Sequence, residues 1–176
     1  MMRRILLAIA FAAACGAAKQ PLDVPFFSQQ KNGCGAASIA MTIRYWANQP
    51  GQTIAAPSAE QVYQRLIDPE RKGILLADMK RYLEELGFRA FTLRGQWSDL
   101  EEHLAKGRPV VVGLKKNRAR QLHFAVVIGT EGNQVWLNDP TRKKASRVKM
   151  ADFIRQWDLG ERWMLLSAPA SRTATQ

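Results

Sequence analysis

The chain has 176 residues and a formal net charge of +11 at pH 7, and hydrophobic residues make up 47% of it. That length and apolar content suffice for one domain with its own core. Two cysteines and two histidines are too few for a disulfide framework, and no Cys/His pair has the spacing of a structural zinc site. No phosphate-binding loop of the form Gly-x4-Gly-Lys-Ser/Thr occurs, so nothing in the sequence supports ATP use, and we expect neither a metal nor another cofactor.

The N-terminal segment has the pattern of a secretory signal. Arg3 and Arg4 precede the apolar run ILLAIAFAAA, and small residues follow. The run is too short to span a bilayer as a mature helix, which needs about 20 residues. We therefore expect residues 1–18 to be a signal peptide and the protein to be exported to the bacterial periplasm or cell envelope.

Two processing routes remain open at this segment. The sequence AACG is compatible with lipoprotein processing, in which Cys15 would carry lipid and anchor the protein to a membrane. Ordinary cleavage before Lys19 is the alternative, with Gly16 and Ala18 as the small residues. In either case Cys34 is the one thiol left, and it has no disulfide partner. A free thiol is a liability in an oxidising compartment unless it has a function, so this favours a catalytic role for Cys34.

The next predicted element is a helix that begins near Cys34. Ile39, Ile43 and Trp46 fall at i, i+4 and i+7, the spacing of one buried helix face. Cys34 then lies in the first helical turn, where unpaired backbone N–H groups and the helix dipole favour the thiolate. The glycines on either side would leave room for an approaching carbonyl group and allow a sharp turn. A small, inert, buried residue is the ordinary alternative for a lone cysteine.

Helices continue through the first half. Ser58 and Gln61 form a capping box ahead of the helix QVYQRLI. Apolar residues at helical spacing predict a second helix over 76–86, ended by a glycine, and the strand FRAFTL follows it. Ser98 and Glu101 then predict the cap of a third helix, DLEEHLAK.

Four apolar, β-rich segments in the second half predict the main sheet: PVVVGL, HFAVVIGT, QVWLN and RWMLLSA. A short helix near ADFIRQW interrupts them. A helical half followed by a mostly antiparallel sheet is an α+β fold, with the active site at the seam between the two. We expect one domain over residues 19–166 and a disordered tail over 167–176, which has no apolar periodicity.

A thiol nucleophile needs a general base, and the base needs an acceptor that orients its ring. His123 begins the strand HFAVVIGT, whereas His103 lies in a segment typical of a surface helix. The turn-rich residues 130–133 predict that HFAVVIGT and QVWLND pair as a hairpin, which would put Asp139 beside His123. Each residue alone also has an ordinary structural interpretation: His123 as a hydrogen-bonded structural histidine, and Asp139 before Pro140 as the start of a turn.

The segments VPFFSQQKNGCGAASIAM, GRPVVVGL, HFAVVIG and LNDP resemble the bacteriocin-processing, double-glycine type cysteine peptidases and their stand-alone relatives, over residues 24–166. The resemblance implies a papain-like fold. It also implies roles for Cys34 as nucleophile, His123 as base and later acid, and Asp139 as orienting carboxylate. Gln29 would donate its side-chain amide to an oxyanion hole, together with the Cys34 backbone N–H.

Gln30 is the neighbouring alternative for the oxyanion donor, and the Gln-x4-Cys spacing of the family favours Gln29. The best-known members of the family carry a membrane domain and an ATPase after the peptidase. This sequence contains neither, so any exporter would be a separate partner.

Basic residues cluster at 115–120 and 141–149 and flank the strands of His123 and Asp139. The clusters predict an electropositive rim that would attract acidic peptides, anionic lipid headgroups or anionic cell-wall polymers, although a solvated basic surface is the ordinary alternative. No nucleic-acid motif accompanies the charge, so a nucleic-acid partner is not expected.

We therefore expect an exported cysteine peptidase that acts by acyl transfer on a peptide or protein with small residues before the cut, because the family it resembles favours glycine pairs. Two alternatives stay open. One is a papain-like amidase or transferase that acts on cell-wall or other amides, and the other is a non-catalytic module that binds a peptide.

Overall fold

The structure is a computed structural model that describes residues 20–117 and 119–170. Residues 1–18, expected to be a signal peptide, lie outside the described residues, and so does Cys15. The helices of the described part are α1 (Cys34–Ala47), α2 (Ala59–Leu66), α3 (Leu76–Glu85), α4 (Trp97–Ala105) and α5 (Met150–Leu159). The strands are β1 (Phe88–Arg94), β2 (Val110–Leu114), β3 (His123–Glu131), β4 (Gln134–Asn138), β5 (Ser146–Lys149) and β6 (Trp163–Pro169).

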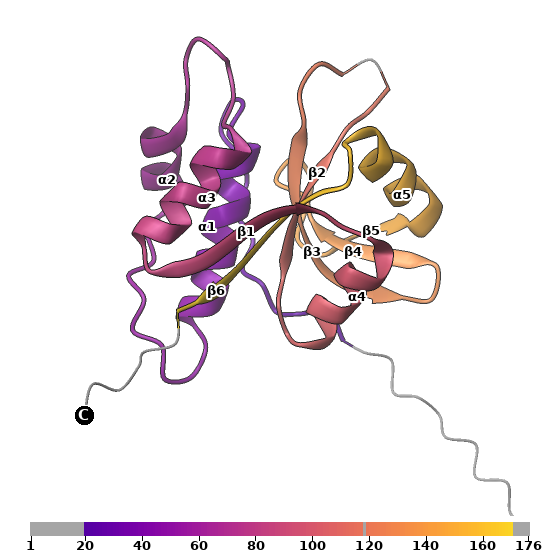
Figure 1. Cartoon of the computed structure of the whole chain (residues 1–176), viewed down its shortest axis with the longest axis horizontal. Helices are drawn as coiled ribbons and strands as arrows, with labels where there is room; N and C mark the ends of the chain where they lie inside the picture. The colour runs from indigo at the N-terminus through magenta and orange to yellow at the C-terminus, as the bar shows by residue number, and fades with distance from the viewer. Residues whose placement is uncertain (1–19, 118, 171–176) are drawn as a thin grey trace, which may run out of the picture.

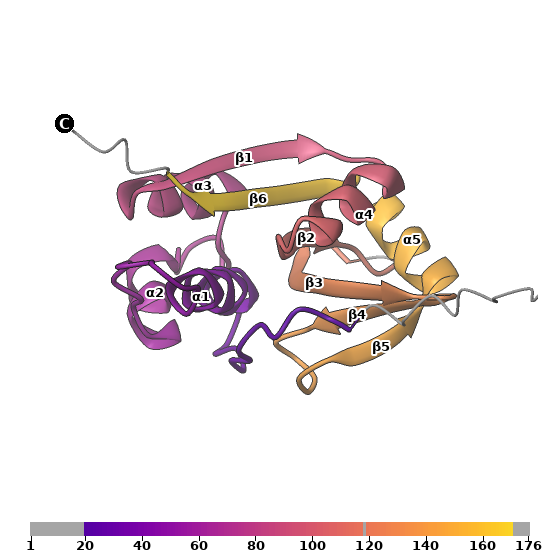
Figure 2. The same cartoon turned by 90° about the horizontal axis from the view of Figure 1, so that it is seen from below.

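The strands form one antiparallel sheet in the order β1-β6-β2-β3-β4-β5. Helices α1, α2 and α3 gather on one side of the molecule, and β3, β4 and β5 lie on the other (Figures 1 and 2). Strands β1 and β6 are long and extend over α3, so they join the two sides. The predicted α+β fold is confirmed.

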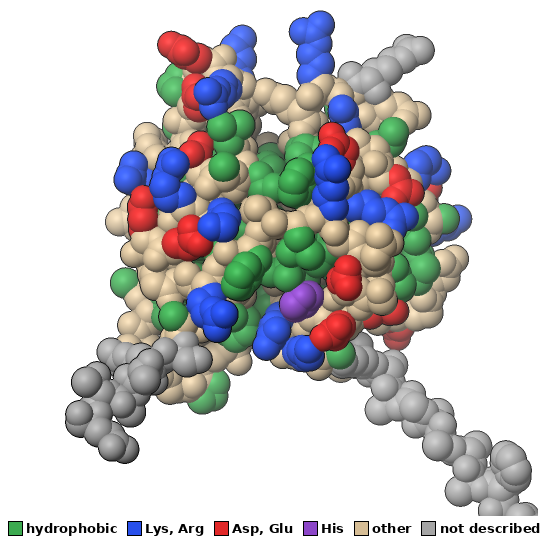
Figure 3. Space-filling view, in the orientation of Figure 1, with side chains coloured by type: hydrophobic (Ala, Val, Ile, Leu, Met, Phe, Trp, Pro, Cys, Tyr) green, Lys and Arg blue, Asp and Glu red, His purple; other side chains and the backbone are tan. Residues whose placement is uncertain are grey.

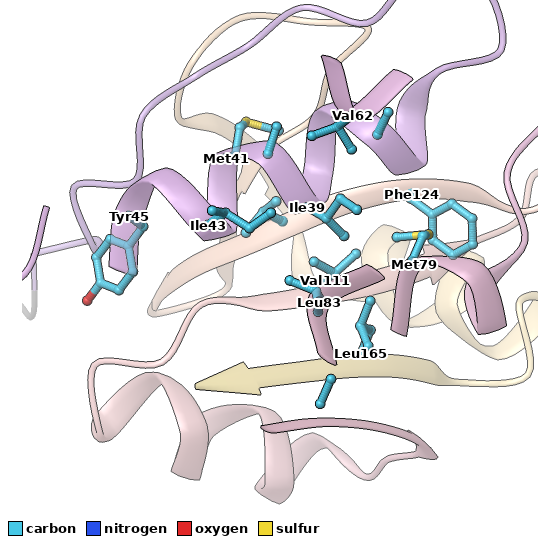
Figure 4. Packing of buried hydrophobic residues seen from close by; sticks show 14 of the residues in the cluster. Ile39, Met41, Ile43, Tyr45, Val62, Met79, Leu83, Val111, Phe124 and Leu165 are labelled. Carbon is cyan, nitrogen blue, oxygen red and sulfur yellow. The ribbon is translucent and has the colours of Figure 1, made fainter. Parts of the chain in front are cut away.

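The helical side and the sheet share one apolar core around α1. Ile39 and Ile43, which the sequence pattern places on one face, are both fully buried. They lie in one cluster with Leu83 of α3, Val111 of β2 and Leu165 of β6 (Figure 4). This packing fixes the N-terminal end of α1, and Cys34 with it, against the sheet.

A second core covers the opposite face of the sheet, where α4 and α5 pack. Its largest members, Phe153 and Trp157 of α5, are almost completely buried. Because both faces of β2 and β3 are covered, these strands are apolar along nearly their whole length, which is why they read as continuous hydrophobic runs. None of the helices in the described ranges combines the length and apolarity that a membrane crossing requires.

Two local predictions about helix starts have different outcomes. The capping box of Ser58 and Gln61 is confirmed, since each backbone N–H donates to the other side chain. The cap predicted from Ser98 and Glu101 is wrong, because α4 begins at Trp97 and its reciprocal pair is Gln96 with Asp99. The extended backbone of Gln96 ends the connection from β1 two residues earlier than the sequence pattern suggests.

The strand pattern also needs two corrections. Strand β5 was not predicted, because its sequence SRVK has a single large apolar residue and reads as part of a basic cluster. Strand β6 continues through Pro169, so the first residues of the expected disordered tail 167–176 are ordered. Ser167 is buried and pairs with Ala90 of β1, and this pairing holds the end of the strand. Residues 171–176 lie outside the described residues.

Gly160 marks the closest approach between α5 and the sheet, and we expect Gly160→Ala to destabilise the protein. A Cβ atom at Gly160 would overlap the backbone carbonyl oxygen of Gly113 in β2, which cannot turn aside as a flexible side chain could. Overpacking of this kind costs about 1 to 3 kcal/mol. Urea unfolding measures the loss, with Gly132→Ala as control: that site faces open space, so only the ~1 kcal/mol backbone cost of its positive φ is expected. Equal stability of Gly160→Ala and the wild type would contradict this packing.

Candidate active site

A cavity of about 740 Å³ opens between the helical side and the sheet. Cys34 from the start of α1, His123 from the start of β3 and Gln29 from the preceding loop all line it. Apolar side chains gather in the hollow at this seam (Figure 3). The cavity therefore lies where the fold brings the first turn of α1 against the sheet, and residues separated by more than eighty positions in the sequence meet there.

Helix geometry sets the surroundings of Cys34. It is the first residue of α1, after Gly33 as N-cap, and it is partly buried. The Cys34 sulfur lies near enough to His123, and to the backbone N–H groups of Phe124 and Gly35, for all three to lower the pKa of the thiol. Its position at the helix start exposes it to the unpaired N–H groups and the dipole of α1.

The glycines beside Cys34 have a different role from the one expected. A Cβ atom at Gly33 would press on the Tyr63 ring, and one at Gly35 would crowd Ile74 and Met79. The space that these glycines leave is therefore filled by the protein's own side chains. They allow α1 to pack closely against α2 and the loop before α3, rather than opening a path for a carbonyl group.

His123 and Asp139 meet across the β3–β4 hairpin, where one strand starts and the other has just ended. His123 Nε2 lies 2.7 Å from Asp139 Oδ1. Because Nε2 is occupied by the carboxylate, Nδ1 is the ring nitrogen that remains for the sulfur. The structure thus brings Cys34 and His123 together in the lining of one cavity, with Asp139 bound to the His123 ring, while His103 lies on α4 and does not line the cavity.

Asp139 is held at both carboxylate oxygens. Its Oδ1 accepts hydrogen bonds from the Thr141 backbone N–H at 2.9 Å and the Thr141 hydroxyl at 2.7 Å. Its Oδ2 lies 3.3 Å from Nε of Arg142. The side chain of Asp139 is 9% exposed, so these partners fix a largely buried carboxylate in one orientation toward His123.

The pKa values of the three groups shift in the directions that favour a charged site. Burial alone would raise the pKa of Asp139, but its hydrogen bond with His123 and the Thr141 contacts outweigh this and lower it to about 2. Burial would lower the pKa of His123, yet its contacts with Asp139 and Cys34 raise it to about 9. Burial would raise the pKa of the Cys34 thiol, and the hydrogen bonds to His123 and to the Phe124 N–H bring the net pKa below its ordinary value. A lowered thiol pKa and a raised imidazole pKa both favour the thiolate–imidazolium pair over the neutral pair.

Of the two neighbouring glutamines, Gln29 is the one at the cavity. Its backbone N–H donates to the Pro140 carbonyl at 3.2 Å, which ties the loop to the residue after Asp139. Its Oε1 atom is buried without a hydrogen-bond partner among the described residues. Gln30 is exposed and does not line the cavity.

Several residues of the cavity were not predicted. Arg71 and Lys72 at its rim, and Trp163 of β6, contribute to its lining, as do apolar residues of the loop before α3. None of the described residues in the two basic segments 115–120 and 141–149 lines it. The prediction that these two segments form an electropositive rim is therefore wrong for the lining of this cavity, whose two basic residues, Arg71 and Lys72, come from the loop between α2 and α3.

Trp136 of β4 lies three residues before Asp139 but does not line the cavity. The Arg147 guanidinium lies 3.9 Å from the centre of its ring.

Among the described residues, no three His, Cys, Asp or Glu side chains form a group that could hold a metal ion. The chemistry available in the cavity is thus that of a thiolate, an imidazole, a carboxylate and amide donors, which is the set required for nucleophilic attack on a carbonyl group.

Papain-like cysteine peptidases combine a helix that starts at the cysteine with an antiparallel sheet that carries the histidine. The model of the Peptidase_C39 like family matches residues 21–162, and the chain belongs to that family. The family is one of cysteine peptidases, and it includes the double-glycine type that the sequence motifs resemble.

Among curated proteins, the chain is similar to one from Pseudomonas fluorescens named "Probable functional amyloid protease FapD". The two are 32% identical over 153 residues, which make up 80% of this chain and 64% of the relative. A second FapD protein, from Pseudomonas aeruginosa, is 32% identical over 132 residues, or 71% of this chain and 53% of the relative. The chain thus spans less than two thirds of the length of these relatives.

Two solved structures have the same fold. The peptidase domain of Streptococcus ComA, a bifunctional ABC transporter of a quorum-sensing pathway, aligns with a TM-score of 0.67 and 20% identity over 84% of this chain and 99% of that domain. A double glycine motif protease from an AMS/PCAT transporter, solved in complex with the leader peptide, aligns with a TM-score of 0.65 and 23% identity over 85% and 94%. At these identities the likeness confirms the predicted papain-like fold.

Proposed function

We propose that the chain cleaves peptide bonds by acyl transfer, with Cys34 as nucleophile, His123 as general base and acid, and Asp139 as the orienting carboxylate. The observation that carries the proposal is the series formed by Cys34 and His123, which line one cavity, and the buried Asp139 carboxylate 2.7 Å from the His123 ring. Such a series is expected where a thiol must be deprotonated before attack and a leaving group protonated after it.

The reaction follows from these contacts. The Cys34 thiolate attacks the scissile carbonyl carbon and forms a tetrahedral intermediate, whose oxyanion accepts hydrogen bonds from the Cys34 backbone N–H and the Gln29 side-chain amide. When the C–N bond breaks, the His123 imidazolium gives its proton to the leaving amine, which departs with it. The imidazole then takes a proton from water, the hydroxide attacks the thioester, and the acid product leaves as the thiolate and imidazolium are restored.

The substrate we propose is a peptide or protein segment with small residues before the scissile bond. The double-glycine motif protease among the structural neighbours supports the small residues, and the proteases among the curated relatives support a peptide or protein substrate. The lining of the cavity is largely apolar beyond the sulfur, which suits an extended segment with apolar side chains on one side of the cut. We also propose that the protein acts outside the cytoplasm, as the signal-like residues 1–18 suggest.

The test uses the purified protein, a panel of peptides that differ only in the two residues before the cut, and peptidoglycan. Mass spectrometry of the products should show cleavage after paired glycines and much slower cleavage after paired leucines. Peptidoglycan should stay intact. Release of peptidoglycan fragments without peptide cleavage would show that the protein is a cell-wall amidase and not a peptidase. If neither substrate gave a product, a non-catalytic binding module would be the remaining interpretation.

Gln29 gives the first quantitative prediction for this mechanism. Gln29→Ala should lower kcat by about 10²- to 10³-fold and leave KM nearly unchanged, because an oxyanion donor acts mainly in the transition state. Steady-state kinetics on the glycine-pair peptide measure both constants. Gln30→Ala is the matched control, since Gln30 is the adjacent, exposed glutamine, and it should behave as the wild type. A large fall in kcat for Gln30→Ala but not for Gln29→Ala would reverse the assignment.

A further inference from the structure

Asn138 is a fully buried amide between the two parts of the proposed catalytic machinery. It is the last residue of β4 and directly precedes Asp139, and it has no exposed surface. Its Nδ2 donates to the Val24 carbonyl at 2.9 Å and lies 3.5 Å from the Pro25 carbonyl. Its Oδ1 accepts a hydrogen bond from the Ala145 backbone N–H at 2.9 Å. Both ends of the amide are thus bound to backbone from different segments of the chain.

On one side of Asn138 is the N-terminal segment, residues 21–30, which carries Gln29 into the cavity. It has no regular secondary structure and runs past β3 and β4 toward α1 (Figure 2). Its attachments to the sheet include a hydrogen bond from the Leu22 N–H to the Ile128 carbonyl. With prolines at positions 21 and 25, which lack an N–H, the segment cannot pair along its length as a strand. The Asn138 amide supplies the donor that binds it midway to Gln29.

On the other side is the turn of residues 139–145, which carries Asp139. Ala145 has a positive φ of 52°, a conformation that is unfavourable for a residue with a Cβ atom. Its N–H is bound by the Asn138 oxygen, so the amide closes the turn at the point where the backbone is strained. The same turn touches the N-terminal segment once more, because the Pro140 carbonyl accepts the Gln29 backbone N–H.

We propose that Asn138 is a positioning residue that holds the Gln29 segment and the Asp139 turn in register, so that the oxyanion donor and the orienting carboxylate face the same sulfur. The inference rests on the proposed function. Asn138 touches neither substrate nor sulfur and acts through these two residues. Because catalysis falls about 10²-fold for a displacement of roughly 1 Å, loss of the amide lowers the rate of the chemical step more than it weakens substrate binding.

The first test compares Asn138→Ala with Ser146→Ala by steady-state kinetics. Ser146 is a second buried polar residue of this region, and its hydroxyl donates to Lys143 in the same turn, but it does not bind the N-terminal segment. Asn138→Ala should lower kcat by about 10- to 100-fold with KM within about threefold. Ser146→Ala should change kcat by less than about threefold. Equal effects of the two variants on kcat would overturn the proposal. The fall in kcat would then follow from the loss of any buried hydrogen bond in this region and not from the contact with the N-terminal segment.

A double-mutant cycle tests the route through Gln29. If Asn138 acts by placing Gln29, the Asn138→Ala substitution should cost clearly less kcat in a Gln29→Ala background than in the wild type. Fully multiplicative effects of the two substitutions would exclude that route. Where Asn138→Ala does not fold, Asn138→Asp replaces it: the new carboxyl has the same shape but donates to the Val24 carbonyl only when protonated. Its kcat relative to the wild type should rise as pH falls, and a ratio independent of pH would contradict the proposal.

Amide hydrogen exchange separates this inference from the proposed function. Asn138→Ala should speed the exchange of the Gln29 and Ala145 backbone amides in the resting protein by about tenfold or more, and Ser146→Ala should leave Gln29 unchanged. A wild-type protein that cleaves no peptide would refute the proposed function while this exchange result stands. Unchanged exchange at Gln29 in Asn138→Ala would refute the positioning role even in an active peptidase.

Discussion

Cys34→Ala should lower kcat/KM for peptide cleavage by about 10⁵- to 10⁶-fold, which is the loss seen when a catalytic nucleophile is removed. The variant retains the cavity and the oxyanion donors, so it should still bind peptide, but a thioester can no longer form. Since alanine is smaller than cysteine and the position is only partly buried, the fold should be unaffected. A discontinuous assay with mass spectrometry can follow such a low rate.

Cys15→Ala is the matched control for this substitution, because Cys15 is the only other thiol in the sequence. It should cleave the same peptide in solution at the wild-type rate. If Cys34→Ala cleaved as fast as the wild type, the nucleophile would lie elsewhere and the proposed mechanism would be wrong.

Asp139→Asn should lower kcat by about 10³- to 10⁴-fold, comparable to the effect of this change in other triads. An amide at this position can present its N–H₂ group to the ring and stabilise the wrong tautomer of His123. It also removes the negative charge that raises the pKa of His123, and the thiolate of Cys34 loses its positively charged partner. Asp152→Asn is a suitable control, because Asp152 is an acidic residue on α5 whose side chain pairs with Arg155 on the surface.

The dependence of kcat/KM on pH provides the signature of this change. In the wild type, activity should rise as Cys34 loses its proton, below the ordinary thiol pKa of about 8.5. It should fall at alkaline pH, as His123, with its pKa raised to about 9, loses the proton needed by the leaving amine. In Asp139→Asn the pKa of His123 should fall and that of Cys34 should rise. The bell-shaped dependence of kcat/KM on pH should therefore narrow on both its acid and its alkaline side. A profile of unchanged width would show that Asp139 does not set these values.

The parts of the site that depend on local patterns could be predicted from the sequence. The apolar spacing behind Cys34 locates the start of α1, since a helix that buries one face must begin where that face begins. The turn between the strands of His123 and Asp139 predicts their hairpin, and antiparallel pairing then brings the two side chains together. Both inferences need only the periodicity of neighbouring residues.

The parts that depend on distant contacts could not be predicted. Asn138 reads as an ordinary residue at the end of a strand, because its partners Val24 and Pro25 lie more than a hundred positions away. The rim residues Arg71 and Lys72 belong to a loop whose place over the cavity follows from the packing of α2 and α3 against α1. Strand β5 exists because β4 offers it an edge to pair with, and its own sequence gives little sign of it.

The central claim is that His123 activates Cys34, and the rate of Cys34 alkylation by iodoacetamide as a function of pH tests it most directly. Mass spectrometry would identify the labelled residue in the wild type, in His123→Ala and in the control His103→Ala. We predict fast labelling at Cys34 well below pH 8.5 in the wild type and in His103→Ala, and a shift of the profile to pH 8.5 or above in His123→Ala. Identical profiles in all three proteins would contradict the account, because the ionisation of the Cys34 sulfur would then not depend on His123.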